Sequence, residues 1–427
     1  MSANYSNLNK PEVMAPAGSF AALQAAINAG CDSVFFGVEQ LNMRARSSYN
    51  FKIEELAEVT KRAKKAGIHT YITMNTLLYE HDLNLMRRIL DEAKKVGITA
   101  AIIADVAAMQ YAREIGLSVH ASTQLSISNY DSVKFYANFA DTIVLAREVD
   151  LNMMKKICDK IKADDLRGPG GKQVKIEVFV HGALCIAQSG RCQMSLLQNN
   201  TSAQRGACLQ ECRKKYRIID DETGKEMIVD NQYVLSPKDL CAIGFLDKLV
   251  EAGVSIFKIE GRGRSPEYVD TVVRCYKQAV DSIVEGTYSQ EKIDAWMQEL
   301  DKVYNRGFSD GYYLGRPLPE WSGKYGSQAK EEKVFVGLAQ HYFPKAGVAE
   351  IKLQAQPLKI GDKLVVMGET TGVVYQEVTE MMEDDQKVEF SKNPALVTVP
   401  FHDRVRKNDK VYLIKERKIL QNGEPVS

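Results

Sequence analysis

The chain has 427 residues, of which 45% are hydrophobic and 26% are charged, and this length favours two domains in an ordinary globular protein. The formal net charge of +1 excludes a general attraction to polyanions, so any surface for nucleic acid must be local. The first residues show no basic segment followed by an apolar run, and no stretch approaches the roughly eighteen apolar residues that cross a bilayer. We therefore expect a cytoplasmic protein that makes no membrane contact.

One pattern recurs along the chain: an amphipathic helix ends at a glycine, and a short apolar run follows. Glycine accepts the left-handed conformation at a helix end that other residues avoid. The runs are β-branched and almost continuously apolar, as in parallel strands that are covered on both faces. No phosphate-binding glycine fingerprint follows the first run, which disfavours a dinucleotide-binding fold. The predicted strands lie at 11–18, 31–37, 68–75, 98–105, 117–124, 141–148, 174–182 and 254–261.

These units predict an α/β fold, a (β/α)8 TIM-like barrel, in residues 1–325. The connection between strands seven and eight is unusually long and forms an insertion at about 183–250. It leaves the carboxyl end of strand seven, the face at which barrels form their active sites. Residues 264–305 predict two helices, and short strands alternate with turns after them. We therefore expect a small C-terminal β-barrel domain at 326–427.

The insertion contains most of the cysteines. In a reducing compartment, clustered cysteines are better candidates for metal ligands than for disulfides. Four thiolates around one site are typical of zinc or of an iron–sulfur cluster. Zinc ribbons generally have paired C-x2-C knuckles, which do not occur here, so we favour iron–sulfur and keep zinc as the alternative. The cysteines of the insertion are Cys185, Cys192, Cys208, Cys212 and Cys241.

Polar side chains at the carboxyl ends of the predicted strands are candidates for contact with substrate. Arginine supplies planar, bidentate donors for a carboxylate or a phosphate. The alternative for each residue is a satisfied structural hydrogen bond or salt bridge. The candidates for substrate binding are Arg44, Arg46, Asn75, Gln124, Arg147 and Arg262, and those for catalysis are His181, Glu260 and Glu177.

Basic residues also gather in two segments, 205–217 and 404–418. Such segments bind backbone phosphates, while an aromatic side chain such as Tyr216 stacks on an unpaired base. A solvated surface is the alternative interpretation.

The segment 177–195 resembles the signature of the collagenase-like peptidase family U32. That signature combines a Glu, a Phe two residues later, a Gly followed by a Cys, and Gly-x-Cys ahead of a Ser. The matching residues are Glu177, Phe179, Gly182, Cys185, Gly190, Cys192 and Ser195. The resemblance continues through 15–18, 146–148, 206–216, 236–240, 258–262 and 305–315.

Members of this family resemble TIM-like barrels, and several carry a [4Fe–4S] cluster on four cysteines. The resemblance implies Cys185, Cys192, Cys208 and Cys241 as ligands, with Cys212 as the alternative fourth ligand. Chains of this length with a C-terminal β domain most resemble the tRNA uridine hydroxylation proteins. The resemblance therefore implies 5-hydroxylation of the wobble uridine, with tRNA as partner and prephenate as co-substrate. A paralogous or accessory subunit is a further expected partner.

Two other functions stay open: a collagenase-like peptidase, and a non-enzymatic, cluster-bearing scaffold of a modification complex. Neither an H-E-x-x-H zinc motif nor a G-x-S-x-G nucleophile elbow occurs in the sequence. His181 precedes Cys185 by four positions, which makes a catalytic Cys–His pair conceivable. One nucleophile would not require four more cysteines in the same segment, so we favour the RNA hydroxylase.

Overall fold

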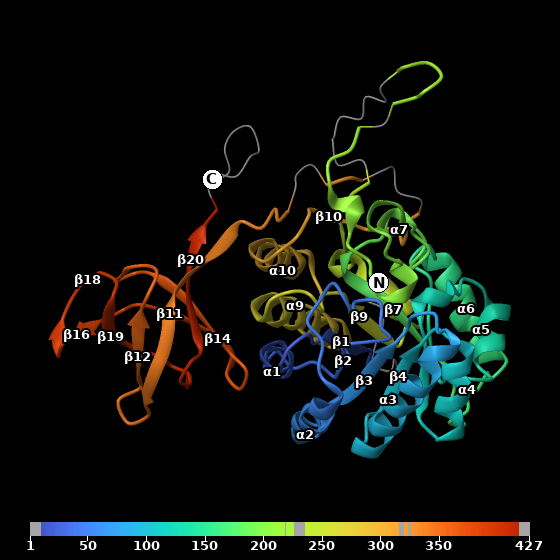
Figure 1. Cartoon of the computed structure of the whole chain (residues 1–427), viewed down its shortest axis with the longest axis horizontal. Coiled ribbons are helices and arrows are strands. Elements are labelled where there is room, and N and C mark those ends of the chain that lie inside the picture. The colour runs from blue at the N-terminus through green and yellow to red at the C-terminus, as the bar shows by residue number, and fades with distance from the viewer. Residues whose placement is uncertain (1–9, 218, 226–234, 316–319, 323–325, 418–427) are drawn as a thin grey trace.

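The computed structural model describes residues 10–217, 219–225, 235–315, 320–322 and 326–417. Figure 1 shows a rounded body of alternating strands and helices and, beside it, an antiparallel β domain. No helix within the described ranges combines the length and the apolar character needed to cross a membrane.

Eight parallel strands close into a barrel, as the sequence predicts. Each strand from β1 to β7 pairs with the next along the chain, and β9 completes the ring by pairing with both β7 and β1. Ile256 of β9 lies opposite Glu12 on one side and Glu177 on the other. The strands are β1 (Glu12–Pro16), β2 (Ser33–Gly37), β3 (His69–Met74), β4 (Ala100–Ile103), β5 (Ser118–Ala121), β6 (Thr142–Val144), β7 (Lys175–Ala183) and β9 (Ile256–Ile259).

Amphipathic helices cover the outside of the barrel. The helix α3 buries Met86, Ile89, Leu90 and Ala93, which recur at helical spacing on one face. This helix ends at Gly97, whose φ of 81° is a conformation that favours glycine. The covering helices are α1 (Phe20–Asn28), α2 (Leu56–Ala66), α3 (Leu83–Val96), α4 (Val106–Glu114), α5 (Tyr130–Tyr136), α6 (Leu151–Ala163), α8 (Leu246–Glu251), α9 (Pro266–Val284) and α10 (Gln290–Lys302).

Basic side chains join the carboxyl ends of neighbouring helices. Lys64 of α2 donates from Nζ to the carbonyl of Val96 at 3.2 Å, and Arg113 of α4 donates from Nη1 to the carbonyl of Asn138 at 2.9 Å. A cation in the last turn also interacts favourably with the negative end of the helix dipole. We call the face formed by the carboxyl ends of the strands the mouth of the barrel. Because the helices run antiparallel to the strands, these contacts lie at the opposite face.

The barrel interior is packed below the mouth. Met14, Phe35, Tyr71, Ala100, Ile102 and Ile256 form an apolar cluster inside the ring of strands. None of these side chains is more than 4% exposed. The interior of the barrel is therefore a solid core, and ligand space lies towards the mouth.

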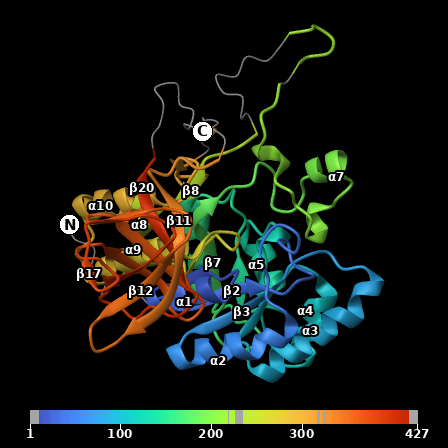
Figure 2. The ribbon, with the colours of Figure 1, turned by 60° about the vertical axis from the view of Figure 1, so that its left-hand side comes forward.

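The predicted insertion is present and lies at the mouth (Figure 2). Its strand β8 (Asp239–Cys241) pairs antiparallel with the end of β7, and β10 (Phe308–Ser309) pairs with β8 in parallel. The insertion also contains α7 (Met194–Asn199) and short 3-10 turns at Ala203–Arg205 and Glu211–Arg213. The sequence pattern did not predict β8 and β10, because each has only two or three residues.

The C-terminal region is a separate antiparallel sheet, as predicted in outline. Its strand order is β15-β14-β20-β11-β12-β19-β16-β17, and among the described residues no pairing joins the two edge strands into a closed barrel. Val336, Ile351, Leu364 and Val399 belong to a core of its own. The strands of this sheet are β11 (Glu331–Phe343), β12 (Val348–Leu353), β14 (Lys363–Gly368), β15 (Gly372–Glu377), β16 (Met382–Glu383), β17 (Gln386–Lys387), β19 (Ala395–Pro400) and β20 (Lys410–Glu416). The short strands β13 (Leu358–Lys359) and β18 (Phe390–Ser391) form a separate two-stranded sheet.

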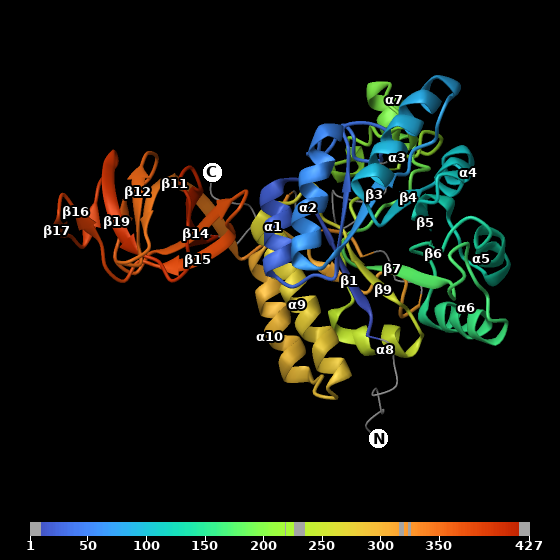
Figure 3. The ribbon, with the colours of Figure 1, turned by 90° about the horizontal axis from the view of Figure 1, so that it is seen from below.

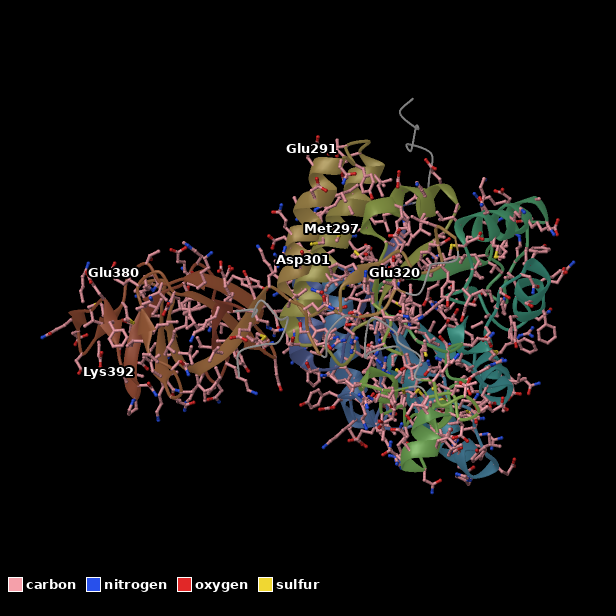
Figure 4. The ribbon with its side chains drawn as sticks, turned by 90° about the horizontal axis from the view of Figure 1, so that it is seen from above. Glu291, Met297, Asp301, Glu320, Glu380 and Lys392 are labelled. Carbon is pink, nitrogen blue, oxygen red and sulfur yellow. The ribbon has the colours of Figure 1, made fainter. Side chains whose placement is uncertain are left out.

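This sheet packs beside α1, α9 and α10 of the barrel (Figure 3). The Asn28 amide of α1 donates to the carbonyl of Thr371 at 3.0 Å, and Lys330 forms a 2.8 Å ion pair with Asp301 of α10. Figure 4 labels Asp301 near this junction and Lys392 towards the far end of the sheet. The boundary predicted at 325/326 adjoins residues outside the described ranges and stays a prediction.

Leu90→Ala should lower the free energy of unfolding by about 2–5 kcal/mol, because Leu90 is fully buried between α3 and the barrel. Urea denaturation followed by circular dichroism measures the change. Leu197→Ala is the matched control, since Leu197 is 81% exposed and should shift stability by less than about 0.5 kcal/mol. Equal effects of the two substitutions would contradict the packing described here.

Candidate functional site at the barrel mouth

Two adjoining cavities open at the mouth. The inner cavity has a volume of about 130 Å³, and the outer cleft has a volume of about 550 Å³. Barrel strands and the cysteine-bearing insertion together line the inner cavity. The two spaces adjoin, and Arg44, Ala183, Gln210, Arg213 and Glu260 line both of them.

Four cysteines line the inner cavity: Cys185, Cys192, Cys208 and Cys212. All four are free thiols. Cys241, the fourth ligand favoured from the sequence, does not line this cavity, whereas the alternative, Cys212, does. The Sγ of Cys241 lies 3.8 Å from the Tyr276 hydroxyl and 3.7 Å from the Met297 sulfur. The physical reason is that β8 directs this side chain towards α9 and α10.

The pKa of Cys212 depends on the other three thiols of the inner cavity. Burial raises the pKa of Cys212 to about 11; Arg213 opposes this shift, and negative charge on Cys185, Cys208 and Cys192 adds to it. A thiol of this kind stays protonated at neutral pH until a metal displaces its proton.

The spacing of the thiols bears on which metal they suit. In the described part of the chain, no three Cys, His, Asp or Glu side chains are gathered around a position for a single metal ion. A [4Fe–4S] cluster distributes its four thiolate ligands over a larger body than one zinc ion does. Four free cysteines around one cavity are a donor set that either a [4Fe–4S] cluster or a zinc ion takes.

Two glycines allow the cysteine-bearing segment to lie against the barrel. A Cβ at Gly190 would meet the Gln124 side chain at 2.2 Å, and a Cβ at Gly206 would meet the Asn42 carbonyl at 2.4 Å. Both residues also have positive φ, 79° and 86° respectively. Larger residues would push the segment away from the rim of the barrel.

Arg205 fastens the same segment to the loop after β3. Its guanidinium forms a bidentate ion pair with Asp82, donates to the Leu77 carbonyl at 2.7 Å, and lies 4.1 Å from the centre of the Tyr79 ring. The hydrogen bonds from Arg205 lower the pKa of Asp82, against the opposing effect of burial. The clamp is therefore complete at neutral pH and weakens as Asp82 is protonated in acid.

Arg44 and Glu260 form an ion pair where the two cavities meet. Arg44 Nη2 lies 3.1 Å from Glu260 Oε1. Burial alone would raise the pKa of Glu260, but Arg44, Arg147 and Arg262 outweigh it and lower that pKa. Glu260 is therefore ionised at neutral pH, in a position to hold a cationic group or to accept a proton.

Arg147 and Arg262 both line the inner cavity but are held differently. Arg262 is 4% exposed and donates to Thr73 Oγ1 at 3.0 Å and to Asn42 Oδ1 at 2.7 Å, so it mainly positions neighbouring loops. Arg147 donates to the Ala183 carbonyl at 2.6 Å, and its buried Nε has no partner within the described ranges. Arg147 thus has one buried N–H donor that the described residues leave unsatisfied.

The remaining substrate-binding candidates also lie at the mouth. Asn75 and Gln124 line the inner cavity, and Asn75 Oδ1 accepts a hydrogen bond from the Met43 backbone at 3.1 Å. Arg46 lines the outer cleft. The structure therefore gathers all the predicted substrate-binding residues around these two spaces.

Glu177 lies below the inner cavity in a buried charge network. One carboxylate oxygen lies 2.8 Å from Lys258 Nζ, and the other lies 2.8 Å from His120 Nδ1. Burial alone would raise the pKa of Glu177, but the charge of Lys258 and the contact with His120 lower it to about 2. Both oxygens are already occupied, so this carboxylate positions Lys258 rather than transferring a proton.

Sequence reasoning missed Lys258. Its side chain lines the inner cavity, and its Nζ lies 4.4 Å from the centre of the Phe35 ring and 5.4 Å from that of Phe179. The available signal was a lysine in the middle of an otherwise apolar strand, two residues before Glu260 and hence on the same face.

His181 is misplaced by the sequence prediction. Simple alternation from Glu177 and Phe179 would direct His181 into the barrel, but a register shift after Phe179 sends its ring outward against Tyr276, Tyr268 and Phe308. Burial lowers the pKa of His181 to about 3, and Arg264 adds to that shift. His181 does not line either cavity and is not a proton-transfer group for a ligand there.

The basic segments differ in their relation to the mouth. Within 205–217, Arg213 and Lys214 line the outer cleft. The segment 404–418 belongs to the C-terminal sheet, and Lys418 lies outside the described residues.

The chain is similar in sequence to one protein family and to several characterised proteins. The sequence profile described as Peptidase family U32 matches residues 18–323. A collagenase of Porphyromonas gingivalis is 49% identical over 411 residues, covering 96% of this chain and 99% of that protein. The tRNA hydroxylation protein P1 of Bacillus subtilis is 31% identical over 397 residues, covering 91% of each. A 23S rRNA 5-hydroxycytidine synthase of Escherichia coli is 30% identical over 395 residues, covering 90% of this chain and 57% of that protein.

The fold and the site define a (β/α)8 barrel protein with a cysteine-lined cavity at its mouth. The match covers well over half of the chain, and the protein belongs to peptidase family U32. The resemblance seen in the sequence is therefore confirmed. Relatives are named both for collagenase and for RNA hydroxylation, so membership alone does not select the reaction.

Arg205→Ala should expose the cysteine-bearing segment, because it removes the bidentate pair with Asp82. Loss of about 1–2 kcal/mol of local stability predicts roughly tenfold faster maleimide labelling of Cys208 in metal-free protein. Arg88→Ala is the control, since its 3.8 Å contact with Glu54 is exposed. Unchanged labelling in Arg205→Ala would show that the clamp does not hold the segment.

Glu177→Gln should destabilise the barrel by about 3 kcal/mol at neutral pH, because the buried Lys258 ammonium loses its counter-charge. The folded-state pKa of about 2 lies below the ordinary value, so the carboxylate stabilises the fold above roughly pH 4.5, and this contribution is lost as the pH falls towards 2. Urea unfolding from pH 7 to pH 3 should show a flatter acid dependence in Glu177→Gln than in the wild type. Glu54→Gln, at an exposed carboxylate, should leave the dependence unchanged; parallel curves for wild type and Glu177→Gln would contradict the network.

Proposed function

We propose that this protein is an RNA-modifying enzyme that hydroxylates the wobble uridine of tRNA at C5. The observation that carries the proposal is the inner cavity, where four free cysteines face Arg44, Arg147, Lys258 and Glu260 at the mouth of the barrel. Similarity to the tRNA hydroxylation protein of Bacillus subtilis over 91% of both chains supports the same reaction class.

The four cysteines of the inner cavity are the proposed ligands of a [4Fe–4S] cluster, and zinc is the alternative metal. Such a cluster, when bound, supplies one-electron redox chemistry or rigidity to the segment that holds it. Arg213 lies next to Cys212 and donates to the Leu184 carbonyl at 2.5 Å and to the Pro237 carbonyl at 2.8 Å, which fixes the chain around the ligands. The positive charges of Arg44 and Arg213 also stabilise thiolates in this position.

Prephenate is the proposed co-substrate. It carries two carboxylates, and guanidinium and ammonium groups recognise carboxylates through charge-assisted hydrogen bonds. Arg147 keeps an unpartnered Nε among the described residues, and Lys258 is held in place by Glu177. Glu260, ionised beside Arg44, is the proposed proton acceptor on the same side of the cavity.

A collagenase-like peptidase is the second candidate, favoured by the 49% identity to the Porphyromonas gingivalis collagenase. Its simplest chemistry would pair Cys185 with His181 as nucleophile and base. The His181 ring instead packs between Tyr276, Tyr268 and Phe308 outside both cavities. This geometry weakens the Cys–His hypothesis.

A non-enzymatic scaffold is the third candidate. Arg147→Ala distinguishes it from an enzyme, because the variant leaves all four cysteines in place while removing a cavity cation. An enzyme should lose activity in that variant, whereas a scaffold should keep it.

Cys212→Ser should lower the iron content of anaerobically purified protein and the absorbance near 400 nm, whereas Cys241→Ser should retain both. The same variants, expressed in a strain that lacks the gene and any paralogue, are compared by mass spectrometry of tRNA nucleosides. We expect wild type and Cys241→Ser to restore 5-hydroxyuridine derivatives and Cys212→Ser to fail.

A colourless protein that contains stoichiometric zinc would contradict the proposed cluster and support a zinc site. The deletion strain could also show an unchanged nucleoside profile while the purified protein hydrolyses collagen peptides. Those two results would contradict the hydroxylase hypothesis and support the peptidase hypothesis.

A further inference from the structure

The outer cleft is the most strongly basic cavity described at the barrel mouth. Because the chain as a whole carries a formal charge of only +1, this is a local concentration of positive charge. The cations lining the cleft are Arg44, Arg46, Arg213, Lys214, Arg264 and Arg306, against one lining carboxylate, Glu260.

Two of these cations have no carboxylate partner in the part of the chain that the structure describes. Among the described residues, neither Arg46 nor Arg264 has a carboxylate within ion-pair distance. The Arg264 guanidinium instead lies 3.5 Å from the centre of the Tyr304 ring, which positions the group without cancelling its charge. Arg306 is different, since its Nη1 lies 3.1 Å from Asp239 Oδ1.

Arg213 adds a positive charge in a fixed position, although Cys212 and Asp239 lie near enough to interact with that charge. Its guanidinium donates to Ser236 Oγ at 3.1 Å and to the Pro237 carbonyl at 2.8 Å, and both acceptors are neutral. The group is therefore oriented before any ligand arrives. Fixed arginine side chains of this kind suit phosphate oxygens, which they can bind in a bidentate manner.

The position of the cleft indicates what it binds. It adjoins the inner cavity at the Arg44–Glu260 ion pair, so a chain seated in the cleft lies next to the entrance of the inner cavity. The cleft, at about 550 Å³, is also several times larger than the inner cavity, at about 130 Å³. An RNA strand has this form, with a repeating anionic backbone and one base that can be displayed on its own.

We infer that the outer cleft binds the RNA phosphates that flank the nucleotide entering the inner cavity, with Arg46, Arg213 and Arg264 as the principal contacts. This inference rests on the proposed function and adds the place and the polarity of substrate binding. An acidic peptide would also be attracted to these cations. Its charges lie on its side chains, however, so a peptide does not combine a repeating anionic backbone in the cleft with one uncharged unit for the inner cavity.

The test measures binding rather than catalysis. Full-length protein, purified anaerobically, is titrated against a fluorescent RNA stem-loop that has unmodified uridines in its loop, over a series of salt concentrations. The variants are Arg46→Ala, Arg264→Ala and the double substitution. The charge-matched control is Lys65→Ala with Lys95→Ala, in the last turns of α2 and α3 at the face opposite the mouth.

We expect the double substitution to weaken RNA binding about tenfold or more at low salt, while the control binds as wild type does. The slope of log Kd against log salt should fall by roughly one for each phosphate contact that is lost. Because Arg46 is exposed and its side chain forms no hydrogen bond or ion pair within the described ranges, Arg46→Ala alone tests the inference even if Arg264→Ala perturbs folding.

Wild-type affinity and salt dependence in both single variants, with tRNA hydroxylation retained, would overturn the cleft assignment and leave the proposed function intact. A second outcome is that the wild type does not bind the RNA but binds a poly-glutamate peptide, and that the arginine variants lose this peptide binding. That outcome would identify an acidic-peptide site and overturn both the cleft assignment and the proposed function.

Discussion

The ion pair between Glu177 and Lys258 joins β7 to β9 at the centre of the barrel, with an Oε1–Nζ distance of 2.8 Å and neither side chain more than 5% exposed. His120 of β5 holds the second carboxylate oxygen, so three strands share one charge network. Burial of charges is costly unless each finds partners with good geometry. The arrangement of the strands around this network is therefore constrained, and it separates the apolar core below from the ligand cavity above.

The register shift in β7 connects this network to the rest of the site. Below the shift, Glu177 and Phe179 face the barrel interior; beyond it, His181 packs against α9. The end of β7 also pairs with β8, which places Cys241 next to Tyr276. The four other cysteines of the insertion remain at the mouth, where glycines and the Arg205–Asp82 pair hold their segment against the barrel rim.

Particular residues show how far sequence reasoning extends. The barrel strands were predictable because each is an apolar run that follows a helix-ending glycine, and these are local signals. The strong charge at the mouth was predictable for Arg44, Arg147 and Glu260, because polar residues at strand ends meet in a barrel. Lys258 was missed because a single inward charge is hard to recognise within an otherwise apolar strand. The orientation of His181 was misjudged because the alternation of side chains between the two faces of β7 is interrupted between Phe179 and His181.

The sequence by itself determined the α/β barrel, the insertion after the seventh strand, the presence of a C-terminal β region and the family signature. Each of these depends on periodicity or spacing within a short stretch of chain, where local physics decides the outcome. Only the tertiary structure decided that Cys212, and not Cys241, shares a cavity with the other three cysteines. It also decided that Lys258 lies in that cavity and that Arg46, Arg213 and Arg264 converge on one cleft. Such convergence depends on strand register and loop packing between residues far apart in the chain, which no local pattern encodes.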